Sequence, residues 1–221
     1  MVSAAKKKEA RATPARQRLL KIADELFYER GLRAVGIDEI IEKSGVAKAT
    51  LYAHFPTKDD LIASYLRQRS VQWREHMTAR LAELPVSPIE RIDAVFAILA
   101  DGCAAPGFRG CPFINAAVEY PDQGHPASEA GSEHRQWILG LFRSLAVDAK
   151  IRQPHRVAAQ LALLYDSAMV GTQMNRSPSA AFHAREVARI LVEAALRKKA
   201  ERKPTRPSGP PRKSAAPGGR R

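Results

Sequence analysis

Residues 37–58 read Ile-Asp-Glu-Ile-Ile-Glu-Lys-Ser-Gly-Val-Ala-Lys-Ala-Thr-Leu-Tyr-Ala-His-Phe-Pro-Thr-Lys, and their apolar spacing predicts two short helices, at about 37–44 and 48–54. Gly45 lies between them, where it accepts the positive φ of a sharp turn without steric cost. The apolar side chains share one face of each helix: Ile37, Ile40 and Ile41 on the first, and Val46, Leu51 and Phe55 along the second. This stretch therefore predicts two helices that pack together across a glycine turn.

Two short helices joined in this way form a helix-turn-helix, whose second helix enters the major groove of DNA. The sequence therefore predicts double-stranded DNA as a partner. Four polar residues of the second helix point away from its apolar stripe: Lys48, Thr50, Tyr52 and His54. Lys and Thr can reach base edges or phosphates, and Tyr can donate a hydrogen bond to a phosphate. For Tyr52 and His54 the alternative is a purely structural role in packing the small domain.

The second helix and its flanks resemble the recognition segment of the TetR family of bacterial repressors. The family segment runs Gly-Val-Ser-x-Gly/Ala-Thr-Leu-Tyr-x-His/Tyr-Phe-x-Ser-Lys-x-x-Leu, and residues 45–61 here read Gly-Val-Ala-Lys-Ala-Thr-Leu-Tyr-Ala-His-Phe-Pro-Thr-Lys-Asp-Asp-Leu. The resemblance covers roughly residues 14–66. It implies that one group approaches the bases and a second holds the phosphate backbone: Lys48, Ala49 and Thr50 in the first, and Tyr52, His54 and Lys58 in the second.

One position departs from the family pattern. Gly36 stands where the family usually has Thr or Ser at the start of the second helix, so the hydroxyl for one expected phosphate contact is missing. Gly36 remains among the candidate DNA-binding residues.

The net charge of +13 is concentrated at the two ends of the chain. Residues 1–18 carry a net charge of +5, residues 197–221 carry +9, and the middle is near neutral. Basic ends neutralise phosphates without reading bases, and this makes DNA affinity salt-dependent. We expect the N-terminal arm, residues 1–13, and the neighbouring Arg16 to contact DNA. The Pro-, Gly- and Ser-rich tail at 202–221 is either a DNA-binding extension or a solvated disordered end.

Apolar periodicity and Pro/Gly positions predict an all-α fold without strands. An N-terminal three-helix DNA-binding domain is expected at 14–57, followed by a larger helical ligand-binding and dimerisation domain at 58–201. The expected helices span residues 14–30, 37–44, 48–54, 58–84, 88–101, 114–119, 126–149, 154–174 and 179–199. Between the fifth and sixth, residues 102–113 hold five Gly or Pro residues and are expected to form a loop.

Several classes of protein are disfavoured. No stretch of eighteen apolar residues exists, so we expect no transmembrane helix and no membrane partner. The basic N-terminus is not followed by an apolar run, so it is no secretory signal, and a cytoplasmic location with reduced cysteines is expected. No nucleophile-elbow signature is present, and we expect neither an enzyme nor a cofactor. If the protein were instead an enzyme that uses Cys111, replacement of this cysteine would abolish turnover.

The segment Arg-Gly-Cys-Pro-Phe-Ile-Asn-Ala-Ala-Val-Glu at 109–119 is similar to a Gly-Cys-x-x-x-Asn-x-x-x-Glu motif in a subgroup of the family. Some members of that subgroup sense reactive electrophiles or lipophilic compounds. Cys111 precedes an expected helix start, where the helix dipole lowers a thiol pKa, and Arg109 adds positive charge. Cys111 is therefore either an electrophile sensor or a small buried residue that locks the loop. A disulfide with Cys103, eight residues earlier, is conceivable.

Asn115 and Glu119 lie one helical turn apart, so they could orient a polar ligand group or cap the loop. Together with Asp122 and His125 they match no closed zinc pattern, and we expect no metal. Large apolar residues at helical spacing in the second domain normally form a core, but the family resemblance implies that some line a ligand cavity. The candidate ligand-binding residues are Trp73, Met77, Phe96, Cys103, Cys111, Phe113, Asn115, Glu119, Trp137, Tyr165 and Met169.

These features predict a ligand-responsive repressor that binds a palindromic operator as a homodimer and is released by a small lipophilic or electrophilic effector. The two recognition helices of such a dimer must lie about 34–36 Å apart. The helices at 154–174 and 179–199 are expected to pair across the two-fold axis, with small residues such as Ala158 at close contacts and Leu161 filling the seam. The alternative is an architectural protein that coats DNA non-specifically through its basic ends.

Overall fold

The computed structural model describes residues 13–84 and 86–200, and over those residues the chain folds into nine helices and no strands. This confirms the all-α prediction. The helices are α1 (Pro14–Arg30), α2 (Ile37–Ser44), α3 (Lys48–His54), α4 (Lys58–Ala82), α5 (Pro88–Ala104), α6 (Pro112–Glu119), α7 (Pro126–Asp148), α8 (Pro154–Asn175) and α9 (Ser179–Ala200). Our expectations for residues 1–12 of the basic arm and for the tail at 202–221 concern residues outside the described ones.

Side-chain caps mark several helix starts. Thr57 and Asp60 form a reciprocal capping box at the start of α4, and Ser87 and Glu90 form another at the start of α5. The loop between α5 and α6 is shorter than predicted, at 105–111. Gly102 stays helical, and Pro112 occupies the first turn of α6. A proline is tolerated there because a backbone N–H in the first turn has no acceptor within the helix.

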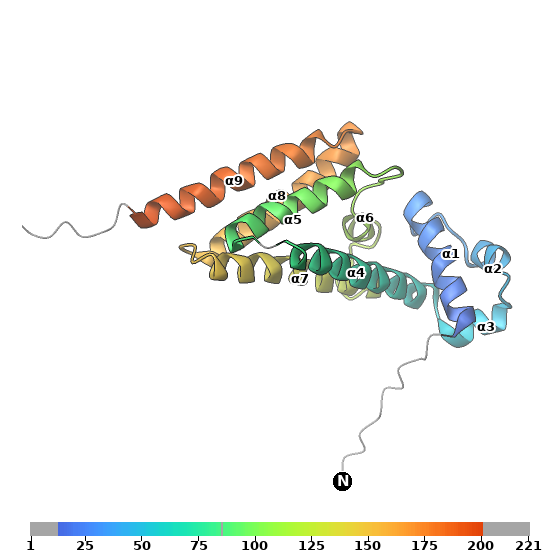
Figure 1. Cartoon of the computed structure of the whole chain (residues 1–221). Helices are drawn as coiled ribbons and strands as arrows, with labels where there is room; N and C mark the ends of the chain where they lie inside the picture. The colour runs from blue at the N-terminus through green and yellow to red at the C-terminus, as the bar shows by residue number, and fades with distance from the viewer. Residues whose placement is uncertain (1–12, 85, 201–221) are drawn as a thin grey trace, which may run out of the picture.

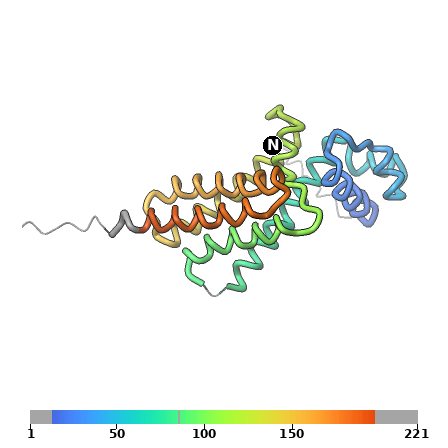
Figure 2. The backbone as a smooth tube through the Cα atoms, turned by 90° about the horizontal axis from the view of Figure 1, so that it is seen from above, coloured from blue at the N-terminus to red at the C-terminus, as the bar shows by residue number. Residues whose placement is uncertain are grey.

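The helices form two parts that α4 joins. At one end, α1, α2 and α3 make the helix-turn-helix domain, and α4 runs from it along the C-terminal helical domain (Figure 1). In that domain α8 and α9 lie side by side (Figure 2), and Gly171 allows their close approach. A Cβ atom at Gly171 would lie 2.7 Å from the Cβ of Ala180. No helix among the described residues is long and apolar enough to cross a membrane.

A charged cluster fixes α9 against α5. The carboxylate of Asp93 accepts two hydrogen bonds from Arg185, at 2.8 and 2.7 Å, and two from Arg189, at 2.6 and 3.0 Å. Hydrogen bonds from Arg185 lower the pKa of Asp93 well below its usual range, and those from Arg189 add to the effect against the opposing influence of burial. Paired charge-assisted bonds of this kind are among the stronger polar contacts in proteins.

We expect Asp93→Asn to lower the free energy of unfolding by about 1–2 kcal/mol at pH 7, because these bonds lose their charge. A carboxyl whose pKa is depressed in the folded state stabilises the fold above the unfolded pKa of about 3.9, and this stabilisation fades as pH falls through the folded pKa. The difference between wild type and variant should therefore shrink below about pH 4. Urea titrations at several pH values measure it, with the exposed Asp148→Asn as control. A difference that stays constant with pH would contradict the assignment.

Candidate nucleic-acid interface and ligand cavity

The helix-turn-helix domain has its own apolar core. Leu19, Ile40 and Leu51, one from each helix, are fully buried there. Gly45 ends α2 in the left-handed conformation, with φ +63° and ψ 24°, as the turn requires. Gly36 caps the start of α2 through its extended backbone alone, without a side-chain hydrogen bond. The core therefore holds α3 in place and leaves one face of α3 exposed to solvent.

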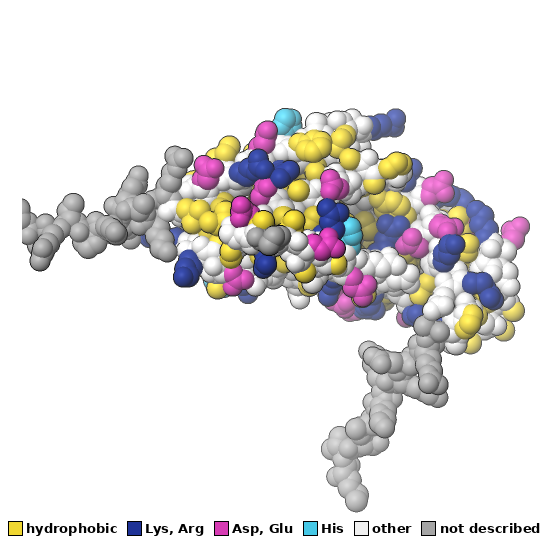
Figure 3. Space-filling view, viewed as in Figure 1, with side chains coloured by type: hydrophobic (Ala, Val, Ile, Leu, Met, Phe, Trp, Pro, Cys, Tyr) yellow, Lys and Arg dark blue, Asp and Glu magenta, His cyan; other side chains and the backbone are white. Residues whose placement is uncertain are grey.

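Three of the candidate base-reading or phosphate-binding residues are exposed on that face: Lys48, Ala49 and Tyr52. Thr50 is half-buried beside them. The Lys48 ammonium lies 3.1 Å from the carboxylate of Asp38, which raises the pKa of the lysine through a hydrogen bond and charge attraction. On the face shown in Figure 3, Lys and Arg side chains gather over this domain among acidic ones.

Three other candidates already have partners inside the protein. A hydrogen bond of 3.1 Å joins His54 Nε2 to Thr13 Oγ1. The Arg16 guanidinium lies over the Phe55 ring, 5.2 Å from its centroid. The Lys58 ammonium donates to the carbonyl of Arg33 over 3.4 Å, and partial burial lowers the pKa of Lys58. These contacts support the structural alternative for His54.

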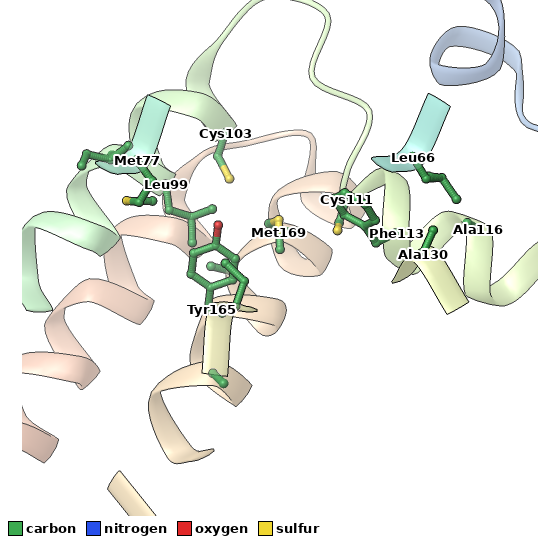
Figure 4. Close-up of a cluster of buried hydrophobic side chains, with 14 of the residues drawn as sticks. Leu66, Met77, Leu99, Cys103, Cys111, Phe113, Ala116, Ala130, Tyr165 and Met169 are labelled. Carbon is green, nitrogen blue, oxygen red and sulfur yellow. The ribbon is translucent and has the colours of Figure 1, made fainter. Parts of the chain in front are cut away.

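A cavity of about 500 Å³ lies between the helix-turn-helix domain and the C-terminal helical domain. Five of the candidate ligand-binding residues line it: Trp73, Cys111, Phe113, Tyr165 and Met169. Figure 4 shows Met169 between Tyr165 on one side and Cys111 with Phe113 on the other. The remaining lining residues were absent from our sequence-based set: Asp24, Tyr28, Arg69, Gln72, His76, Gly102, Phe108, Gly110, Pro112 and His134.

Four candidates for the ligand site pack elsewhere. Met77 and Phe96 are fully buried, and Phe96 contacts the rings of Phe142 and Tyr165 at centroid distances of 5.6 and 6.4 Å. Trp137 lies under the Arg74 guanidinium, and Cys103 is buried in the core. Arg69, Gln72 and His76 surround Trp73 at helical spacing on α4, so they could have been found from the sequence.

Several polar groups of the cavity wall are paired within the protein. Arg69 donates two hydrogen bonds to Asp24, at 2.5 and 3.0 Å, and its guanidinium stacks 3.9 Å from the centroid of the Tyr28 ring. The ring of His134 stacks on Phe113 with 3.8 Å between centroids. Burial lowers the pKa of His134 to about 4, with a further contribution from the charge of Arg74, so this histidine is neutral at pH 7.

Asn115 and Glu119 do not line this cavity but join the two domains. The carboxylate of Glu119 accepts the backbone N–H groups of Leu32 and Arg33, at 3.0 and 2.7 Å. Asn115 donates from Nδ2 to the carbonyl of Arg109 over 3.1 Å and so caps the loop. Of the two roles that the sequence left open for this pair, these contacts favour the structural one.

Tyr28 makes a second link between α1 and the loop before α6. Its hydroxyl donates to the carbonyl of Gly110 at 3.1 Å and accepts the N–H of Arg109 at 3.0 Å. The left-handed backbone of Gly110, with φ +84°, brings these groups to the ring. Since Tyr28 also lines the cavity, the helix-turn-helix domain forms part of the cavity wall.

Of the two roles that the sequence left open for Cys111, the structure favours the small buried residue over the electrophile sensor. Cys111 is buried at the start of α6, and this burial raises the pKa of its thiol, although the backbone N–H groups of Phe113 and Ile114 act in the opposite direction. Burial also raises the pKa of Cys103, and both cysteines are free thiols. The sequence showed the helix start but not the desolvation, which dominates. The described residues contain no group of three or more His, Cys, Asp or Glu that could hold a metal ion.

Comparisons with known proteins agree with this architecture. The family model described as bacterial regulatory proteins, tetR family, matches residues 19–65. A solved TetR-family transcriptional regulator from Streptomyces coelicolor is 38% identical, covers 83% of this chain and 95% of its own, and superposes with a TM-score of 0.73.

Curated relatives match over shorter stretches. The transcriptional repressor KstR2 of Mycobacterium tuberculosis is 31% identical over 81 residues, which are 37% of this chain and 40% of the repressor. The transcriptional activator FasR of Mycolicibacterium smegmatis is 43% identical over 53 residues, or 24% of each chain. The chain thus spans about two fifths or less of the length of these curated relatives.

We expect iodoacetamide to label Cys111 slowly in the folded protein, with an apparent thiol pKa above the free value of about 8.5. Burial disfavours the charged thiolate, which is the form that reacts. Mass spectrometry of digests taken between pH 7 and 10 measures the rate. The same protein unfolded in urea is the control, and both cysteines should label quickly there. Fast labelling of Cys111 at pH 7 would restore the sensor interpretation.

Proposed function

Because this chain belongs to the TetR family of bacterial regulatory proteins, we propose that it is a ligand-responsive repressor that binds a palindromic operator as a homodimer. One observation carries the ligand-responsive part: the cavity is walled on one side by α1 of the helix-turn-helix domain, through Asp24 and Tyr28. A bound molecule therefore touches both domains at once.

The link from cavity to DNA is short. Tyr28 holds the loop at Arg109 and Gly110, and Glu119 holds the turn between α1 and α2 at Leu32 and Arg33. On the other side, α4 begins beside α3 and carries Arg69 and Trp73 into the cavity wall. A ligand that alters the packing of α1 on α4 changes the position of the recognition helix.

In a homodimer this movement changes the distance between two recognition helices, which must lie about 34–36 Å apart to enter successive major grooves. A ligand that binds more tightly to a dimer with a different spacing lowers the affinity for the operator. The operator lowers the affinity for the ligand by the same coupling free energy. The buried thiol of Cys111 supports a non-covalent effector over a reactive electrophile.

The dimer proposal rests on an apolar surface of α8 and α9. Its exposed residues are Leu163, Val170 and Met174 on α8, with Phe182, Val187 and Ile190 on α9. Ala158 and Leu161, which we expected at the dimer contact, are instead fully buried within the chain. Exposed apolar patches of this kind are typical of protein interfaces. In a dimer with two-fold symmetry, this surface of each copy would pack against the same surface of the other.

The alternative is a protein that coats DNA through charge. Such a protein would bind specific and random DNA with similar affinity at physiological salt, whereas the proposed repressor would prefer its operator. Selection of bound DNA from a random pool should enrich one palindrome.

We expect Lys48→Ala to cost about 1–3 kcal/mol on that site and to relax base preference, through loss of a base contact. Tyr52→Phe should weaken binding to all sequences alike without changing the salt dependence, since no charge is lost.

Lys43→Ala on α2, an exposed lysine paired with Glu39, is the matched control for Lys48→Ala. Fluorescence anisotropy with operator and random duplexes at several salt concentrations separates the two effects. A wild-type protein that binds both duplexes equally at physiological salt would leave only the coating function.

We expect Ile190→Glu to make the protein monomeric at micromolar concentration, because a charge would be buried in the proposed interface. Val118→Glu on α6 introduces the same charge at a similarly exposed apolar residue away from α8 and α9, and it should stay dimeric. Sedimentation equilibrium measures both variants. A monomeric wild type at this concentration would contradict the dimer proposal.

A further inference from the structure

An aspartate in the first turn of α2 pairs with the recognition helix. The Oδ1 atom of Asp38 accepts a hydrogen bond from the Lys48 ammonium over 3.1 Å, although the two residues are ten positions apart. The exposed fraction is 86% for the Asp38 side chain and 63% for the Lys48 side chain. An ion pair that is this exposed adds little to the stability of the fold, so we looked for its role in DNA binding.

The carboxylate of Asp38 is not used to build the domain. The cap of α2 is the backbone of Gly36, without a side-chain hydrogen bond. The neighbouring Glu39 is the structural acid of this helix, because it is half-buried and pairs with Arg30 and Lys43. Among the ion pairs of the described residues, Asp38 takes part in the one with Lys48 alone.

The pair lies at the end of α3 that faces base edges in a helix-turn-helix. Lys48 is the first residue of α3, and the N-terminal residues of a recognition helix contact the bases while the preceding helix crosses the backbone. When α3 enters the major groove, a lysine that reaches a base edge has the carboxylate of Asp38 within hydrogen-bond distance of its ammonium. Asp38 is therefore placed beside the same base edges.

A carboxylate at this place has an energetic cost. The phosphates repel it, so it lowers the affinity for every DNA sequence. The cost is offset where the carboxylate accepts a hydrogen bond from a base, and the amino group of cytosine N4 is the donor that Asp reads in the major groove.

A G·C pair matches a lysine and an aspartate held side by side. Guanine presents two neighbouring acceptors, N7 and O6, and the N4 donor of its cytosine follows directly. In an A·T pair the N6 donor separates two acceptors, N7 and O4, so one ammonium cannot take both acceptors while the carboxylate takes the donor. The order of groups therefore favours G·C.

From this geometry we propose that Asp38 is a specificity-determining residue that accepts a hydrogen bond from cytosine N4, while Lys48 donates to N7 and O6 of the paired guanine. The two side chains together read one G·C pair in each half of the operator. The inference rests on the proposed function, since it takes α3 as the helix in the groove. It adds Asp38, which was absent from our sequence-based set of DNA-binding residues.

Single-atom changes in the DNA test this reading on the full-length protein. N4-methylcytosine keeps its base pair but places a methyl group where the amino hydrogen faces the major groove, and 7-deazaguanine lacks the N7 acceptor. Each analogue replaces one base at a time, symmetrically in both halves of the operator selected from a random pool, and fluorescence anisotropy gives the Kd. We expect one G·C pair at which each analogue weakens wild-type binding at least about fivefold.

Variants assign each contact to its side chain. At that pair the penalty of N4-methylcytosine should disappear in Asp38→Ala, and the penalty of 7-deazaguanine should disappear in Lys48→Ala. Asp38→Ala should also bind random duplexes more tightly than wild type, because a negative charge near the phosphates is lost. Glu42→Ala is the matched control: it removes an exposed carboxylate from the same helix and should keep both penalties. In the DNA, 5-methylcytosine adds a methyl group but keeps the N4 donor.

The outcomes separate this inference from the proposed function. If no cytosine of the operator gives an N4-methyl penalty in the wild type, or if the penalty persists in Asp38→Ala, the role of Asp38 is refuted while the preference for the operator stands. A wild-type protein that does not distinguish operator from random DNA loses the proposed function itself.

Discussion

The carboxylate of Glu119 accepts two backbone N–H groups from the turn between α1 and α2, and this contact positions the rest of the site. It holds α6 against the helix-turn-helix domain, so the loop before α6 lies where the Tyr28 hydroxyl can bridge Arg109 and Gly110. Tyr28 and Gly110 both line the cavity on that side. The same few hydrogen bonds therefore join the cavity wall to the domain that carries α3.

Burial determines the chemistry of this cavity more than residue type does. Cys111 sits at a helix start, yet desolvation raises the pKa of its thiol and makes it a poor nucleophile. His134 is neutral at pH 7 for the same reason. Arg69 keeps its charge, but Asp24 neutralises it within the wall. The result is a site with aromatic walls in which Asp24 and Arg69 are paired with each other.

Sequence patterns were most successful where the cause is local. Caps such as Thr57 and Ser87 and the turn at Gly45 fixed helix starts and ends to within a few residues, because each acts within one helical turn. They were least successful for the ligand site. Phe96 and Tyr165 have the same apolar, helical pattern, yet Phe96 packs in the core and Tyr165 lines the cavity.

The sequence by itself determined the all-helical fold, the helix-turn-helix and the family, because these follow from periodicity, capping and a recognition segment contiguous along the chain. Only the tertiary structure decided which residues surround the cavity. Tyr28 meets Gly110 across 82 positions and Leu32 meets Glu119 across 87, and no local pattern encodes such pairs. The desolvation of Cys111 and the pairing of Arg69 with Asp24 also arise only when separate helices pack together, since both depend on what each side chain touches.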